Sequence, residues 1–227
     1  MLIPSIDLMG GKIVQLVQGE TKALEFDNFD YWIDRFSKYP LVQVIDLDAA
    51  RGVGNNRAIV SEVVRRLPCQ VGGGIRTAET ARQLLEAGAR RVIFGSVLLK
   101  NGEIDTEYAA ALASSLGAAS LVFALDSRAG RVAIEGWRKD TALTAFDMIR
   151  ALEPFCEAFL YTHIDTEGLM RGIPLNIVAE LRERTSRRLI VAGGISSQET
   201  IETLHSMGVD AVVGMAIYSG LLNIPAP

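Results

Sequence analysis

The sequence is short of cysteine, of long apolar runs and of clustered basic residues, and each shortage excludes a class of protein. Its two cysteines, Cys69 and Cys156, are too few for a disulfide framework or a cysteine-rich zinc site, so we expect two small buried thiols. No apolar run approaches the roughly 20 residues that a bilayer-spanning helix needs, and no cationic start precedes an apolar signal core. We therefore expect a cytoplasmic protein.

The charge balance excludes a further class of partner. Lysine and arginine number 23 against 27 aspartates and glutamates, and no basic run offsets the formal charge of −4, which argues against nucleic-acid and membrane-surface binding. Hydrophobic residues make up 49% of the 227 residues, enough to bury a large core. Since α/β barrels often use this length as one unit, we predict a single domain over residues 1–227.

The strongest internal pattern is a glycine-rich segment that occurs twice. Val-Gly-Gly-Gly-Ile-Arg at residues 71–76 returns as Val-Ala-Gly-Gly-Ile-Ser at residues 191–196, and each copy lies between an apolar run and a helical pattern. Other landmarks recur at an offset of 119 residues: Asp7 with Asp126, Gly95 with Gly214, and Asp46-Leu47-Asp48 with Asp165-Thr166-Glu167. These matches predict two similar halves, about residues 1–119 and 120–227.

Apolar runs and helical patterns alternate along the chain. The runs are short and rich in β-branched residues, which is typical of strands buried on both faces of a parallel sheet. They cover residues 2–6, 42–47, 69–71, 92–94, 121–125, 158–162, 189–192 and 211–213. The helical patterns cover residues 31–37, 57–66, 78–87, 107–116, 142–152, 176–183 and 197–207, the last preceded by a capping box of Ser196 and Glu199. Hairpin-like insertions follow the first and fifth strands, at residues 11–16 and 130–134. Eight such units in two similar halves predict a closed (β/α)8 TIM barrel with a short final helix.

Carboxylates stand at the ends of several predicted strands. Because barrels bind ligands at the carboxyl ends of their strands, we expect Asp7, Asp48, Asp126, Thr162 and Glu167 to line one mouth. Asp7 and Asp126 are four strands apart and so lie across that mouth from each other. A carboxylic acid and a carboxylate in this arrangement can donate and accept protons in an isomerisation or enolisation. The alternative, that each merely caps the following loop, is weakened by their recurrence in both halves.

The rim of the same mouth is rich in glycine. Two groups lie on opposite halves: Gly73, Gly74, Gly95 and Ser96 in the first, and Gly193, Gly194, Gly214 and Met215 in the second. Each group would offer backbone N–H groups and a helix N-terminus to one phosphate. A tight turn with positive φ explains any single glycine equally well. The paired groups predict a ligand with a phosphate at each end.

Trp137 and His163 follow the fifth and sixth strands, and the role of each is open to two interpretations. Trp137 either packs in the core or offers a stacking surface for a heteroaromatic ligand. Side chains alternate along a strand, so only one of Thr162 and His163 points inward, and we expect it to be Thr162.

At these positions the sequence resembles the ProFAR (phosphoribosylformimino-5-aminoimidazole carboxamide ribotide) isomerases of histidine biosynthesis. The resemblance covers nearly the whole chain and rests on residues 3–8, 44–48, 71–76, 126, 136–137, 162–168, 193–195 and 214–218. It implies a barrel that converts a phosphorylated aminoaldose into an aminoketose by an Amadori rearrangement, with no cofactor and no metal.

The resemblance also implies roles for individual residues. Asp7 is the general base that removes the C2 proton, Asp126 is the general acid for ring opening, Thr162 supports that step, and Trp137 covers the imidazole part of the substrate. The expected substrate- and phosphate-binding residues are Gly19, Asp48, Gly73, Gly74, Arg76, Gly95, Ser96, Trp137, Gly168, Gly193, Gly194, Gly214 and Met215. We expect a monomer that binds one bisphosphorylated small molecule and neither nucleic acid nor membrane.

Three positions depart from the family's usual pattern. Gln15 stands where arginine is usual, Glu167 where aspartate is usual, and Met215 where a basic residue is frequent. These departures leave the Asp7 and Asp126 pair intact and bear instead on substrate affinity.

Two other functions stay open. A dual-specificity isomerase would also act on phosphoribosylanthranilate in tryptophan biosynthesis with the same acid–base pair, and would differ in the loop around Trp137 and Arg138. A non-catalytic sugar-phosphate-binding barrel would have no use for Asp7 and Asp126, whose charges repel phosphates. The related cyclase subunit of the pathway is disfavoured because its opening residues and second hairpin differ from those of this chain.

Overall fold

A closed ring of parallel strands forms the centre of the computed structural model, which describes residues 1–223. Within these residues the barrel consists of β1 (Leu2–Met9), β4 (Val42–Asp46), β5 (Cys69–Gly72), β6 (Arg91–Phe94), β9 (Leu121–Arg128), β12 (Ala158–His163), β13 (Arg188–Ala192) and β14 (Val209–Val213). Each strand pairs in parallel with the next, β6 pairs with β9, and β14 pairs back to β1. The predicted (β/α)8 barrel is confirmed.

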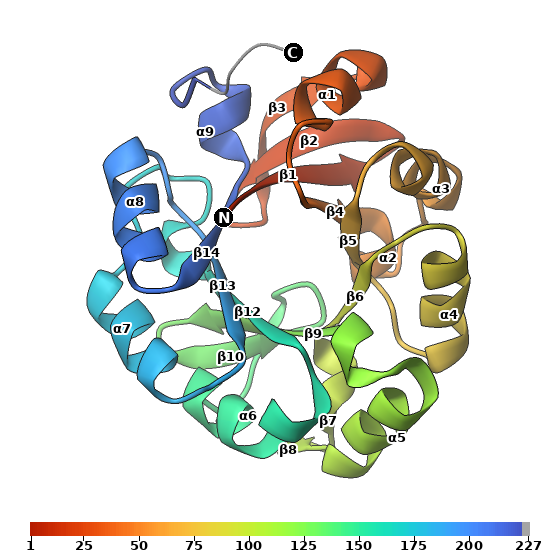
Figure 1. Cartoon of the computed structure of the whole chain (residues 1–227), viewed down its shortest axis with the longest axis vertical. Coiled ribbons are helices and arrows are strands. Elements are labelled where there is room, and N and C mark those ends of the chain that lie inside the picture. The colour runs from red at the N-terminus through yellow and green to blue at the C-terminus, as the bar shows by residue number, and fades with distance from the viewer. Residues whose placement is uncertain (224–227) are drawn as a thin grey trace.

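Helices surround this ring, most of them on its outer face (Figure 1). They are α1 (Phe29–Phe36), α2 (Leu47–Arg51), α3 (Arg57–Arg66), α4 (Ala78–Glu86), α5 (Thr106–Leu116), α6 (Ala145–Leu152), α7 (Leu175–Glu183), α8 (Gln198–Ser206) and α9 (Met215–Tyr218), with 3-10 turns η1 (Ser96–Leu98), η2 (Ala118–Ser120), η3 (Glu153–Phe155) and η4 (Ile164–Thr166). A small ribbon of β7 (Leu99–Lys100) and β8 (Glu103–Ile104) precedes α5. The last helix is short, as predicted, and residues 224–227 lie outside the described part of the chain.

The predicted helix bounds agree with the structure to within a few residues, but the predicted capping box is wrong. The N-cap of α8 is Ser197, whose hydroxyl accepts the backbone N–H of Thr200 at 3.1 Å. Ser196 instead donates its hydroxyl to the carbonyl oxygen of Met170 at 3.0 Å. Two adjacent serines offered equivalent capping groups, and the extended backbone at Ser197 decides between them.

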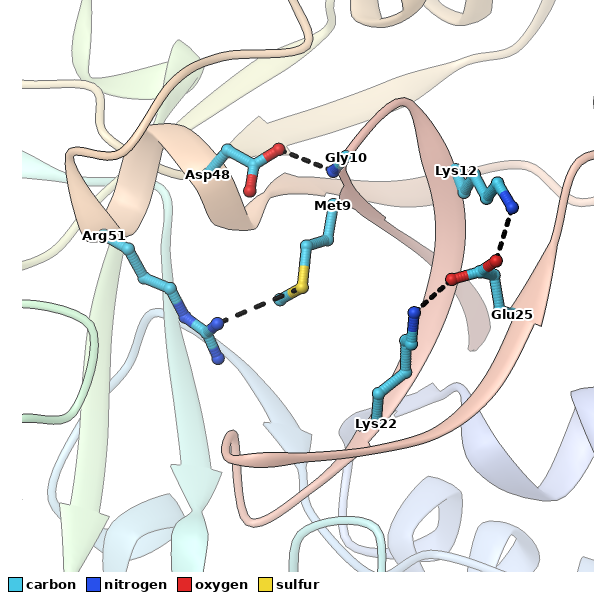
Figure 2. Close-up of polar contacts among 7 residues, drawn as sticks. All are labelled: Met9, Gly10, Lys12, Lys22, Glu25, Asp48 and Arg51. Carbon is cyan, nitrogen blue, oxygen red and sulfur yellow. Dashed lines mark hydrogen bonds and ion pairs between the residues drawn. The ribbon is translucent and has the colours of Figure 1, made fainter.

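Both predicted hairpins are present. β2 (Lys12–Val17) runs antiparallel to β1, and β10 (Arg131–Ile134) runs antiparallel to β9. The first hairpin continues into β3 (Thr21–Phe26), where Glu25 binds Lys12 at 2.5 Å and also binds Lys22. The second continues into the short β11 (Lys139–Asp140). Figure 2 shows Glu25 between its two lysines on this first hairpin.

Alternation along the strands separates two cores. In β1, Ile3 belongs to the apolar cluster inside the barrel, whereas Ile6 and Leu8 belong to the cluster between strands and helices. In β9, Val122 and Phe123 divide in the same way. Polar residues at inward positions near the strand ends therefore face the mouth of the barrel.

The two halves repeat in backbone conformation as well as in sequence. Gly73 and Gly193 have φ angles of 96° and 107°. Gly95 (φ −125°, ψ −105°) and Gly214 (φ −116°, ψ −87°) share a second unusual conformation at the end of β6 and β14. Equivalent loops thus follow equivalent strands, as a half-barrel repeat requires.

One of the predicted matches between the halves is wrong by two residues. The backbone N–H of Gly10 donates to Asp48 Oδ2 at 2.7 Å, and the backbone N–H of Ala129 donates to Asp165 Oδ2 at 2.9 Å. Asp165 therefore corresponds to Asp48 and not to Asp46. The offset differs because the segment between the first two barrel strands is two residues longer in the first half.

Both cysteines lie in the core. Cys69 and Cys156 are buried free thiols, as expected, and burial raises the pKa of each to about 12. Among residues 1–223, no helix combines the length and the apolar character needed to cross a membrane.

Replacing Asp46 tests how the loop after β4 is held. This buried carboxylate accepts the N–H of Ala49 at 3.1 Å, the N–H of Asn56 at 2.6 Å and Nδ2 of Asn56 at 2.8 Å. Asp46→Ala leaves these donors unsatisfied, so we expect the free energy of unfolding in urea to fall by about 2–4 kcal/mol. Asp34→Ala, at an exposed position, should change it by less than about 0.5 kcal/mol. Equal losses in the two variants would contradict this role.

Candidate active site

The carboxyl ends of the barrel strands and the loops that follow them enclose a cavity of about 230 Å³. Asp7, Asp126, Thr162 and Glu167 all line it, as expected. Most of the predicted binding residues also line this cavity: Gly19, Gly73, Gly74, Arg76, Gly95, Ser96, Trp137, Gly168, Gly193, Gly194, Gly214 and Met215. The structure therefore brings together residues from both halves of the chain.

Asp48 is the exception, and its predicted place on the cavity wall is wrong. β4 ends at Asp46, and α2 then turns the chain, so that Asp48 faces the turn between β1 and β2 (Figure 2). Its Oδ2 accepts the N–H of Gly10 at 2.7 Å and Nδ2 of Asn56 at 3.0 Å. Asp48 fixes the first hairpin and does not line the cavity.

Asp7 lies in β1 at an inward position near the end of the strand. Ser5, two residues earlier on the same face, donates its hydroxyl to Asp7 Oδ1 at 2.8 Å. Burial raises the pKa of Asp7 to about 6, and the Ser5 hydrogen bond opposes that rise. A carboxylate with a pKa near neutrality can accept a proton and release it again at physiological pH.

Polar side chains inside the barrel support Ser5 from the neighbouring strands. Gln43 in β4 lies next to Ser5, with Nε2 at 3.5 Å from the serine Oγ, and Gln70 in β5 donates Nε2 to Gln43 Oε1 at 2.8 Å. All three side chains are buried. This row of side chains orients the hydroxyl that faces Asp7.

Asp126 faces the cavity from β9, four strands away from Asp7. Trp137 donates Nε1 to Asp126 Oδ2 at 2.8 Å, and Thr162, opposite Asp126 in the register of β9 and β12, donates a second hydrogen bond. Burial raises the pKa of Asp126, while both hydrogen bonds favour the ionised form. The three residues form one hydrogen-bonded group on the wall.

The alternation predicted for the end of β12 is confirmed. Thr162 points into the cavity, whereas His163 lies outside its wall, with Nδ1 at 2.9 Å from the Thr166 hydroxyl. Burial lowers the pKa of His163.

Glu167 is the third carboxyl group of the cavity. Burial, together with the smaller effect of the negative charges of Asp7 and Asp126, raises its pKa to about 8. At neutral pH this side chain is therefore mostly protonated, and the cavity carries less negative charge than its three acidic residues suggest.

The rim glycines are required by the approach of backbone to backbone. A Cβ atom at Gly73 would lie 2.2 Å from the carbonyl oxygen of Asp46, and one at Gly193 would lie 2.4 Å from that of His163. The turn interpretation of these glycines is thus correct, and it also brings their backbone to the cavity wall.

The helices that begin at the cavity are not those directly after the repeated glycine segments. The N-caps of α4 and α8, Thr77 and Ser197, lie outside the cavity wall. The short η1 and α9 begin at the wall, capped by Gly95 and Gly214. Helix starts from the fourth and eighth units therefore face the cavity.

Gln15, one of the departures from the family pattern, is buried beneath the second rim group. Its Nε2 donates to the carbonyl oxygen of Val14 at 2.8 Å, and a Cβ at Gly214 would lie 2.4 Å from its Oε1. Gln15 thus packs against the loop after β14, whereas Met215, the next departure, lines the cavity itself.

Comparison with known proteins identifies the family. The sequence model of the family described as histidine biosynthesis protein matches residues 1–223. The chain belongs to this family. A 1-(5-phosphoribosyl)-5-((5-phosphoribosylamino)methylideneamino) imidazole-4-carboxamide isomerase of Methanocaldococcus jannaschii is 35% identical, covering 99% of this chain and 96% of that protein. The proteins of the same name from Methanosphaera stadtmanae and Methanothermobacter thermautotrophicus are 36% and 38% identical, with 99% of this chain covered in both cases and 96% and 95% of theirs. The family resemblance predicted from the sequence is confirmed.

Ser5 and Arg51 are among the cavity residues that were not predicted from the sequence. Ser5 had a signal, since it stands two residues before Asp7 and so shares its face of the strand. Arg51 had none, because the five residues of α2 are too few to show helical periodicity. Among residues 1–223, no group of three or more His, Cys, Asp or Glu side chains is placed to hold a metal ion.

Glu167→Gln tests the protonation of the third carboxyl group. The folded state retains a proton that the unfolded chain releases above pH 4.5, so stability should fall as pH rises from about 5 through 8. Glutamine cannot ionise, and the variant should lose about 1–3 kcal/mol of this pH dependence, since each pKa unit is worth about 1.4 kcal/mol and cavity water weakens the effect.

Urea unfolding at several pH values measures this slope. Glu183→Gln, at an exposed position of α7, is the matched control and should keep the wild-type slope. An unchanged slope in Glu167→Gln would mean that Glu167 is ionised at neutral pH in the folded protein.

Proposed function

We propose that this protein is a ProFAR isomerase, which converts the aminoaldose ProFAR into the corresponding aminoketose in histidine biosynthesis. The observation that carries the proposal is a cavity with Asp7 and Asp126 on opposite strands and a glycine loop from each half at its rim. Membership of the family and full-length similarity to isomerases of this name support it.

Asp126 and Asp7 divide the proton transfers between them. Asp126, whose pKa is raised by burial, donates a proton to the ring oxygen as the C1–O bond breaks and the nitrogen lone pair forms a C1–N double bond. Asp7 then removes the proton from C2, and the resulting enol rearranges to the ketone. Thr162 supports the first step through its hydrogen bond to Asp126. No cofactor or metal is part of this scheme.

The two rim groups are proposed to hold the two phosphates. Their backbone lines the cavity, and η1 and α9 direct their N-terminal ends to it. The overall charge of −4 cannot attract the substrate, so these local fields must. Protonation of Glu167 reduces the repulsion that three carboxylates would exert on a bisphosphate.

Trp137 is proposed to cover the imidazole part of the substrate. It already lines the cavity, and its indole is anchored to Asp126. We further propose that the enzyme works as a monomer in the cytoplasm, since one chain encloses the cavity and the family's role is biosynthetic.

A purely binding barrel is a weaker account of this cavity. Burial of Asp7 and Asp126 disfavours their charged forms and adds nothing to phosphate affinity, whereas an acid–base pair uses such shifted pKa values. Assays of the purified protein with ProFAR and with phosphoribosylanthranilate distinguish a dedicated isomerase from a dual-specificity one.

Substitution of the two aspartates separates catalysis from binding. Asp7→Asn keeps the shape and removes the proton acceptor, so kcat for ProFAR should fall by roughly 10²- to 10⁴-fold, or about 3–5 kcal/mol of barrier. Asp126→Asn should lose less, because Thr162 and water can assist ring opening. Steady-state kinetics give kcat, and calorimetry should show the affinity nearly unchanged.

Asp34→Asn, on the exposed face of α1, is the control and should retain wild-type kcat. Near-wild-type turnover by Asp7→Asn would overturn the mechanism. A loss confined to affinity would indicate a binding role.

Anion binding tests the two rim groups directly. Crystals soaked in sulfate or phosphate should show one anion against Gly73, Gly74, Gly95 and Ser96, and another against Gly193, Gly194, Gly214 and Met215. The reason is that both loops present backbone donors to the cavity. Anions found only on surface lysines and arginines would refute the two-phosphate proposal.

A further inference from the structure

The short helix α2 directs two side chains at the first hairpin (Figure 2). Asp48 accepts the N–H of Gly10, and Arg51 reaches further along the same hairpin. Nη1 of Arg51 lies 4.0 Å from Met9 Sδ, and Nη2 donates to the carbonyl oxygen of Gly19 at 2.5 Å. The guanidinium thus holds the hairpin at the point where it lines the cavity.

Arg51 also contacts the second hairpin. A Cβ atom at Gly136 would lie 3.5 Å from Arg51 Cγ, so the backbone of Gly136 packs on the arginine stem. Arg138 donates Nη2 to the carbonyl oxygen of Arg51 at 3.4 Å. Arg51 therefore contacts the residues on both sides of Trp137, Gly136 and Arg138.

The indole of Trp137 links these contacts to the acid–base pair. A Cβ at Gly19 would lie 2.4 Å from Trp137 Cε3, so the ring lies against the bare backbone of Gly19. The Nε1 of the same ring donates to Asp126 Oδ2 at 2.8 Å. The contacts are continuous from Arg51 through Gly19 and Trp137 to Asp126.

In the second half of the barrel, the residue equivalent to Arg51 is a glycine, which contacts the first hairpin through its backbone alone. Gly168 stands 117 residues after Arg51, the offset that relates Asp48 to Asp165. A Cβ at Gly168 would lie 2.3 Å from the carbonyl oxygen of Leu16, so the first hairpin packs directly on its backbone. The symmetry of the two halves therefore does not require an arginine at position 51, and the role of the Arg51 side chain is specific to the first half.

We propose that Arg51 is a positioning residue, which holds Gly19 and thereby fixes the Trp137 indole over the mouth and orients the Asp126 carboxyl group. The effect of Arg51 on turnover rests on the proposed isomerase function, whereas its effect on the position of the Trp137 indole does not. Without the guanidinium, Gly19 loses its donor, the indole loses its support, and Asp126 loses the N–H that faces it.

Fluorine NMR measures the conformational part without substrate. The chain has two tryptophans, so incorporation of 5-fluorotryptophan gives two resonances, which Trp137→Phe assigns. In Arg51→Met the Trp137 resonance should move toward that of free 5-fluorotryptophan, while that of Trp32, a buried residue of α1, should stay in place as an internal reference. Arg65→Met, which removes an exposed arginine from α3, should move neither resonance. Arg51→Lys keeps a donor for Gly19 and should give a smaller displacement in the same direction.

Kinetics with ProFAR measure the catalytic part. The groups that face Asp126 are Trp137 from the second hairpin, Thr162 from β12 and Glu167 from the loop after it. The Trp137 hydrogen bond lowers the pKa of Asp126, so its loss raises that pKa and keeps the acid protonated to higher pH. In Arg51→Met, kcat/KM should fall by about tenfold or more, and its alkaline limb should move to higher pH.

If Arg51 only stabilised the fold, Arg51→Met would lower the free energy of unfolding but would leave the Trp137 resonance and the alkaline limb unchanged. An unchanged Trp137 resonance and an unchanged alkaline limb in folded Arg51→Met would overturn the proposal. If Arg51→Met does not fold, the same two readouts in Arg51→Lys decide it. If the wild type does not turn over ProFAR, the isomerase proposal fails, and the NMR comparison still decides the role of Arg51.

Discussion

Hydrogen bonding between β14 and β1 closes the sheet, and the arrangement of the cavity depends on that closure. A closed parallel barrel brings all strand ends to one mouth, so residues far apart in the sequence become neighbours. Alternation then directs Ser5, Asp7, Asp126 and Thr162 inward while Ile6 and Leu8 pack under the helices. The first hairpin crosses to the second half, where Gln18 donates its N–H to the carbonyl oxygen of Glu167 at 3.0 Å. Each half therefore encloses the cavity together with the other.

Burial of three carboxyl groups in one cavity sets its chemistry. Burial disfavours the charged form of each, and the negative charges of Asp7 and Asp126 also raise the pKa of Glu167. With a pKa of about 8 Glu167 keeps its proton at neutral pH, whereas Asp7, at about 6, is mostly ionised. Asp126 has a raised pKa but is approached by the N–H of Trp137 and the hydroxyl of Thr162. Carboxyl groups in one cavity thus differ in protonation state, a difference on which acid–base chemistry depends.

Long or repeated patterns in the sequence predicted the fold correctly. The matched halves and the run of short apolar strands predicted the barrel, and strand alternation placed Thr162 inward and His163 outward. The sequence did not predict side-chain positions that a few local contacts determine. Asp48 and Asp126 both lie near the carboxyl end of a strand, but the five-residue α2 turns Asp48 toward Gly10. So short a helix shows no periodic pattern in the sequence. Arg51 was missed for the same reason, and the choice between Ser196 and Ser197 depends on a single backbone conformation.

In the mechanism that we propose, each half of the barrel holds one phosphate and the reacting carbon lies between Asp7 and Asp126. A crystal structure of Asp7→Asn with bound ProFAR tests it most directly, because the variant should bind the substrate and convert it slowly. The predicted result is one phosphate against the Gly73 and Gly95 loops, the other against the Gly193 and Gly214 loops, and C2 within reach of the residue 7 side chain. Both phosphates on one half, or C2 remote from residue 7, would contradict the account.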